Sequence, residues 1–222
     1  MEKMTLAKKQ KVIKGVLNKI KKHRNTIGKF FAGVSEPLEI EAEKTTQKNL
    51  WKIMLLDIQS RGGPKLNDTY IRTIKKKFER DVDLRKAAQM ENAEKFQYLY
   101  QKIVGLPRIG PKITAVFMKG MISKFQVFPE LKNYLFLPVD LHVANILEKR
   151  LKLFRKEEIC KGNPFKSPKS LVFQNQLSEI HRPRIELDDF WFIGYIFCNK
   201  KSGLVCNEFC WIRKYCKDKF KV

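Results

Sequence analysis

Apolar residues recur every three or four positions through most of this chain, and this spacing constrains the fold more than any other feature. Such spacing places the apolar side chains on one face of a helix. It predicts helices over residues 6–23, 49–59, 67–79, 83–90, 92–104, 111–121, 140–154 and 170–181, and a last apolar segment follows at 190–197. No stretch of useful length alternates apolar and polar residues as a half-buried strand does. We therefore expect an all-α protein.

Positive charge dominates the composition. The 222 residues include 46 Lys and Arg against 23 Asp and Glu, a formal net charge of +23. Nucleic acid is the commonest polyanion that balances such an excess in a soluble protein, and an anionic membrane is the alternative. No run of about 18 apolar residues exists to span a bilayer, and the first residues lack the apolar region of a signal peptide. We expect an intracellular protein, cytoplasmic in a prokaryote, that binds nucleic acid and no membrane.

The turn from Leu106 to Lys112 is the most informative local motif. Gly110 and Pro111 stand where one predicted helix ends and the next begins. Proline at a first helical position loses only an amide that has no intrahelical partner. The backbone N–H groups of a helix start carry partial positive charge and bind a phosphate without reading any base. Arg108 and Gly110 are therefore candidate DNA contacts, and Lys112 projects from the first helical turn.

A second motif runs from Pro138 to His142. Asp140 follows a Pro-Val pair and precedes an apolar run, as a helix N-cap does, and a plain N-cap would contribute about 1 kcal/mol. His142 is a candidate phosphate contact, with simple packing as the alternative. Trp191 lies in an apolar segment and is expected in the core.

The two motifs together resemble those of the helix-hairpin-helix DNA glycosylases, the superfamily of endonuclease III, adenine glycosylase and the 8-oxoguanine glycosylases. The resemblance rests on L-P-x-I-G-x-K-x-x-A from Leu106 to Ala115 and on V-D-x-H-V from Val139 to Val143. It implies that Lys112 is the nucleophile of a lyase reaction and that Asp140 assists cleavage of the glycosidic bond. It also implies two domains, a helical barrel over residues 45–124 and a second helical domain from residues 1–44 with 125–222. The two domains would flank a DNA-binding cleft, and Lys112 and Asp140 would face each other across it.

The chain departs from the family pattern at two places. The usual Gly-x-Gly turn is Arg108-Ile109-Gly110 here, and the interval from Lys112 to Asp140 is lengthened by an insertion containing Phe125, Phe128, Pro129 and Tyr134. Gln59 resembles the glutamine that fills the gap left by an extruded base. The alternative is a polar residue at a helix end.

Four cysteines gather near the end of the chain, at Cys198, Cys206, Cys210 and Cys216, within 19 residues. Such clustering in an intracellular chain indicates one metal centre held by thiolates. The family resemblance implies a [4Fe-4S] cluster that organises a basic loop, although the first two intervals are each one residue longer than in endonuclease III. Zinc is the alternative, because four-cysteine zinc sites tolerate variable spacing. Cys160 stands 38 residues before Cys198 and is not expected to be a ligand.

The chemistry follows from these assignments. A base inside a duplex must be extruded before its glycosidic bond can be reached. A carboxylate such as Asp140 then stabilises the developing positive charge on the sugar, and a neutral Lys112 attacks C1′. We therefore predict a monomeric bifunctional glycosylase and abasic-site lyase that removes damaged bases, oxidised pyrimidines first, or mismatched bases from duplex DNA. The alternatives are a monofunctional glycosylase, in which Lys112 only binds phosphate, and a non-catalytic DNA-binding module.

Overall fold

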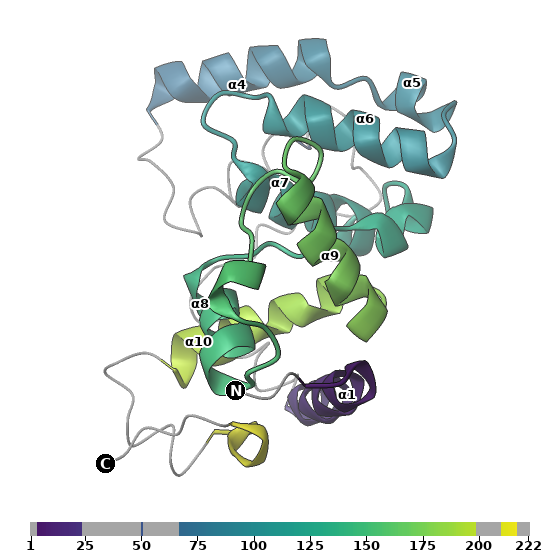
Figure 1. Cartoon of the computed structure of the whole chain (residues 1–222). Coiled ribbons are helices and arrows are strands. Elements are labelled where there is room, and N and C mark those ends of the chain that lie inside the picture. Colours follow the sequence, from purple (N-terminus) through teal and green to yellow (C-terminus); the bar gives the residue numbers. More distant parts are fainter. Residues whose placement is uncertain (1–3, 24–49, 51–66, 199–209, 217–222) are drawn as a thin grey trace. The chain divides into compact units, whose positions relative to one another are not determined.

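The computed structural model describes residues 4–23, 50, 67–198 and 210–216, and every regular element within them is helical (Figure 1). The all-α prediction is confirmed for this part of the chain. None of the described helices is both long enough and apolar enough to cross a membrane.

The chain divides into two compact units. Residues 39–138 form one, here called the middle unit, and residues 1–38 with 139–222 form the other, here called the terminal unit. In this division residues 125–138 group with the middle unit, and the N-terminal helix groups with residues 139–222. The two domains that the family resemblance implies stay a prediction.

The described part of the middle unit consists of α4 (Asp68–Asp81), α5 (Leu84–Ala88), α6 (Asn92–Val104) and α7 (Pro111–Lys119). Polar side chains start two of them: Asn67 Oδ1 accepts from the amide of Tyr70 at 2.8 Å, and Asp83 caps α5. The apolar stripes meet in one core, where Phe78 of α4 packs edge-on against Phe117 of α7 and both are fully buried.

The insertion is ordered by short helical turns that the sequence did not predict. The helix of α7 continues as a wider π-helical turn, η2 (Gly120–Lys124), and a 3₁₀ helix follows, η3 (Pro129–Tyr134). Between the two turns, Gln126 and Phe128 adopt the left-handed backbone region, with φ of 55° and 57°. Lys95 of α6 then holds η3 through an ion pair with Glu130, Nζ to Oε1 2.7 Å.

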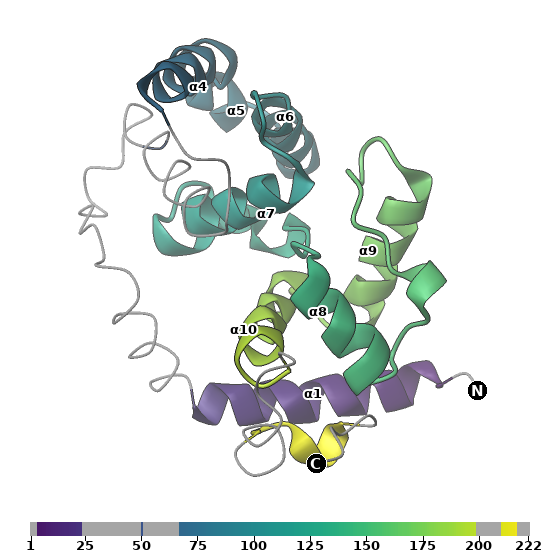
Figure 2. The same ribbon diagram turned by 90° about the vertical axis from the view of Figure 1, so that its left-hand side faces the viewer.

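The terminal unit contains α1 (Leu6–Lys22), α8 (Leu141–Asn145), α9 (Pro168–Ile180) and α10 (Asp189–Ile196) (Figure 2). Short helical turns join them at η4 (Ile146–Arg150), η5 (Lys156–Glu158) and η6 (Arg184–Asp188). The helix expected over 140–154 ends at Arg150. Lys152, with φ of 50°, turns the chain there and allows Leu151 and Leu153 on either side to be buried.

Two glycines permit close packing in the terminal unit. A Cβ on Gly194 of α10 would lie 2.8 Å from the Cβ and the carbonyl oxygen of His142, so α8 and α10 approach more closely than a larger residue would allow. A Cβ on Gly15 of α1 would overlap the ring of Tyr215.

The C-terminal segment with η7 (Arg213–Tyr215) therefore lies against α1. Trp211 adds to this contact, because its indole stacks on His23 at the end of α1, centroid to centroid 4.3 Å, and on Phe192 of α10 at 5.7 Å.

Candidate nucleic-acid interface and catalytic residues

Buried side chains of the turn itself and a hydrogen bond from α4 stabilise the turn between α6 and α7. Leu106 and Ile109 are 3% and 4% exposed, and the amide of Ile109 donates to the carbonyl of Leu106 at 3.1 Å. The hydroxyl of Tyr70 on α4 donates to the carbonyl of Pro107 at 3.0 Å. Burial raises the pKa of Tyr70 while the charge of Arg108 opposes the rise, so this hydroxyl keeps its proton at neutral pH and remains a donor.

Arg108 adopts a glycine-like backbone, at the position that the resemblance in the sequence aligns with a glycine. Its φ is 58°, in the left-handed region that costs a residue with a Cβ about 1 kcal/mol or more. The side chain is exposed, and its guanidinium lies 5.3 Å from the centre of the Tyr70 ring. A cation over an aromatic face is stabilised by about 0.5–1 kcal/mol at an exposed site, which offsets part of the backbone strain.

Gly110 is the N-cap of α7, and Pro111 is the first residue of the helix. With φ at −91°, Gly110 has an ordinary backbone, and a Cβ built on it would meet nothing within 4 Å. Packing within the described part of the chain therefore does not require glycine here. The open space over the helix start is available to a group from outside, and Lys112, half-buried, lies in the same first turn.

Asp140 is the N-cap of α8, as one interpretation of its sequence position predicted. Its Oδ1 accepts from the amide of Val143 at 3.0 Å, and the residue is half-buried. The carboxylate is thus fixed at a helix start, where the helix dipole stabilises negative charge. A catalytic role stays a prediction alongside this structural one.

His142, Trp191 and Tyr195 form an aromatic cluster on α8 and α10 that the sequence analysis missed. The Trp191 and Tyr195 rings are stacked, 5.0 Å apart with planes 8° from parallel, and His142 meets them edge-on at 6.1 and 5.5 Å. Tyr195 is 45% exposed, and Trp191, which was expected in the core, is half-buried. Trp191 and Tyr195 are four positions apart, about one turn of a helix, and this spacing could have predicted that their rings lie side by side.

Among the predicted metal ligands, Cys210 and Cys216 are each 9% exposed and Cys198 is half-buried. Cys206 lies outside the described residues, as does Gln59. In the described part of the chain, no three His, Cys, Asp or Glu side chains are grouped as metal ligands. The metal centre therefore stays a prediction.

The described site residues separate into two groups. Arg108, Gly110 and Lys112 lie in one turn of the middle unit, and Asp140 and His142 lie at the start of α8 in the terminal unit. Comparison with protein-family models, curated proteins and solved structures finds no match for this chain.

Proposed function

We propose that this protein is a base-excision DNA glycosylase with abasic-site lyase activity, which removes damaged, chiefly oxidised, or mismatched bases from duplex DNA. The observation that carries the proposal is the turn before α7. Arg108 takes the left-handed backbone of a glycine there, Gly110 leaves the helix start open, and Lys112 stands in its first turn.

Binding of the DNA backbone is supported by the electrostatics of this turn. A helix start offers amide donors and partial positive charge to one phosphate, and Arg108 adds a full charge at an exposed position. These contacts are independent of base sequence, so they position the strand and leave the choice of base to other residues.

Lys112 is the proposed nucleophile. Its neutral amine attacks C1′ of the extruded nucleotide, the glycosidic bond breaks, and the base leaves with the bonding electron pair and takes up a proton. The sugar ring then opens to a Schiff base between the lysine nitrogen and C1′. Loss of a proton from C2′ expels the 3′ phosphate by β-elimination and nicks the strand.

Asp140 is proposed to stabilise the positive charge that develops on the sugar as the bond to the base lengthens. Its fixed position at a helix start supports this role, because a carboxylate that is already oriented needs no reorganisation during the reaction. The exposed face of Tyr195, stacked on Trp191, offers a surface against which a base could stack.

We further propose that the four clustered cysteines hold a [4Fe-4S] cluster. Support comes from their clustering and from the burial of Cys210 and Cys216 in a segment packed on α1. Purified protein should be brown and contain iron and sulfide in equal amounts, and Cys216→Ser should lower both. A colourless protein with one zinc per chain would instead favour the zinc alternative.

Borohydride trapping on DNA that contains an abasic site tests the reaction. Wild-type protein should form a covalent adduct, and Lys112→Gln should abolish it. Lys119→Gln is the matched control, because it removes one charge from the same helix seven residues away. Asp140→Asn should slow release of the base from a lesion duplex by about 10²-fold or more, as loss of one preorganised electrostatic group does.

Borohydride trapping on abasic-site DNA, together with base release and strand cleavage on a lesion duplex, separates the alternative functions. An adduct that survives in Lys112→Gln would refute the nucleophile assignment. Base release without strand cleavage would indicate a monofunctional glycosylase, and DNA binding with neither reaction would indicate a non-catalytic module. A panel of duplexes, each with one lesion, identifies the base.

A further inference from the structure

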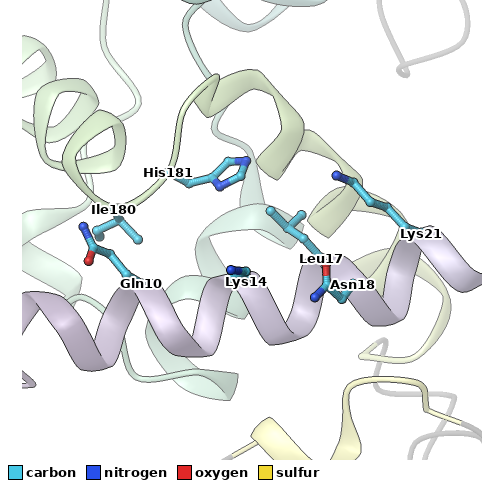
Figure 3. Close-up of a pocket in the computed structure, with 7 residues that line it drawn as sticks. All are labelled: Gln10, Lys14, Leu17, Asn18, Lys21, Ile180 and His181. Atoms are coloured by element: carbon cyan, nitrogen blue, oxygen red, sulfur yellow. The ribbon is translucent and has the colours of Figure 1, made fainter.

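A pocket of about 360 Å³ opens in the terminal unit between α1 and the end of α9 (Figure 3). Its walls are formed by Gln10, Lys14, Leu17, Asn18, Lys21, Ile180 and His181. None of these residues belongs to the proposed glycosylase site.

The spacing along α1 explains why one helix supplies five of the seven residues. Positions 10, 14, 18 and 21 follow one another at intervals of four, four and three, and position 17 lies three after 14 and four before 21, which places all five on one face of a helix. Leu17 and Ile180, 3% and 6% exposed, make an apolar floor. Gln10 closes one end by donating from Nε2 to the carbonyl of Glu179 at 2.9 Å.

The polar lining of the pocket is rich in hydrogen-bond donors and carries positive charge. Lys14 and Lys21 carry charge, and among the described residues no carboxylate lines the pocket. In the described part of the chain, Lys14 has no acidic partner. Figure 3 shows the side chain of Lys21 reaching from α1 toward the side of the pocket where His181 lies.

One carboxylate, that of Glu186, contacts two of the residues that line the pocket. Glu186 Oε2 is 3.0 Å from His181 Nε2 and 3.9 Å from Lys21 Nζ. It fixes the imidazole and offsets part of the lysine charge, so it competes with any anion that enters the pocket.

We infer that this pocket binds a phosphate group. Lys14, Lys21 and the amide of Asn18 line the same pocket and can act as donors to phosphate oxygens, and lysine binds phosphate as a point charge. The phosphate comes either from a DNA strand or from a small phosphorylated molecule.

Titration with inorganic phosphate tests the site in the full-length protein. Lys14→Gln and Lys21→Gln should each weaken binding about tenfold, the loss expected for one charged hydrogen bond. Lys8→Gln, an exposed position on α1 outside the pocket, removes the same charge and should leave the affinity within about twofold of wild type. Glu186→Gln should strengthen binding, because it removes the competing carboxylate.

Titration with a duplex distinguishes the two sources of phosphate. If a DNA strand supplies it, Lys14→Gln weakens duplex binding more than Lys8→Gln and lowers the slope of log affinity against log salt by about 1. If a small molecule supplies it, both variants bind duplex alike, and only the affinity for inorganic phosphate falls. The inference is overturned if Lys14→Gln and Lys21→Gln match Lys8→Gln in both titrations. These readouts measure binding, so failure of the lyase reaction would leave them unaffected.

Discussion

The guanidinium of Arg108 lies 5.3 Å from the centre of the Tyr70 ring, and the hydroxyl of that ring donates to the carbonyl of Pro107. One side chain of α4 therefore supports two successive residues of the turn before α7, although 37 positions separate Tyr70 from Pro107 in the sequence. This support makes a left-handed arginine tolerable at a position where glycine would be unstrained.

Substitution of Arg108 should reveal the backbone strain. Arg108→Ala keeps the left-handed backbone and loses the contact with Tyr70, so it should destabilise the protein by about 1 kcal/mol. Arg108→Gly loses the same contact but relieves the strain, and it should be more stable than the alanine variant by about 1 kcal/mol. Urea unfolding measures both values. The opposite ranking would contradict the left-handed conformation. Both variants should bind DNA less tightly, because each removes an exposed positive charge.

The close contact of α8 with α10 should be sensitive to a single methyl group. In Gly194→Ala, the new Cβ meets backbone atoms of His142 that cannot move aside cheaply, so the protein should lose roughly 1–3 kcal/mol of stability. Gly120→Ala is the matched control. A Cβ at that helical position meets nothing within 4 Å, so the substitution should stabilise the protein by about 0.5–1 kcal/mol. Thermal unfolding of the two variants should therefore shift in opposite directions.

The ion pair between Lys95 and Glu130 should make stability depend on pH. The hydrogen bond from Lys95 lowers the pKa of Glu130 below its ordinary value of 4.5. A lowered pKa in the folded state gives stability that is present above pH 4.5 and is lost as the pH falls through the folded value. Glu130→Gln should therefore be less stable than wild type at pH 7, and the difference should shrink as the pH falls below 4.5.

A control for this prediction is the pair between Arg80 and Asp81, in which the arginine side chain is 65% exposed. Asp81→Asn should cost less stability at pH 7 than Glu130→Gln, because solvent screens an exposed pair, whereas the Lys95 side chain is only 8% exposed. Equal losses would show that the burial of Lys95 does not matter.

The exposed ring of Tyr195 should contribute to DNA binding if a base stacks there. Tyr195→Leu should lower the free energy of unfolding by about 0.5–1.5 kcal/mol, because it removes the stack on Trp191 from a side chain that is 45% exposed. Its affinity for lesion-containing DNA should fall about fivefold to a hundredfold, the range measured for loss of one base–aromatic stack. Val172→Ala, at a 55% exposed apolar position on α9, should change neither quantity. An unchanged affinity in Tyr195→Leu would exclude a stacking role.

Helices with strong apolar periodicity were predictable, and the irregular connections between them were not. The stripe that includes Phe96, Leu99 and Ile103 predicted α6 with the observed boundaries. The turns around Gln126 and Phe128 carry no local signal of a left-handed backbone, because neither residue favours it. Burial of the neighbouring apolar residues and the distant partner Lys95 hold this segment, and neither is visible in local spacing.

The sequence by itself determined the helical class, the helix starts at Asn67, Asp83 and Asp140, and the concentration of positive charge and cysteine, since each depends on residues close together in the chain. Tertiary packing decided that Arg108 takes the conformation of a glycine, that Tyr195 stacks on Trp191 at the surface, and that Lys14 and Lys21 share a pocket with His181. Each of these three features depends on contacts between separate helices or on how much of a side chain stays exposed after the helices pack. Local spacing in the sequence encodes neither the contacts nor the exposed fraction.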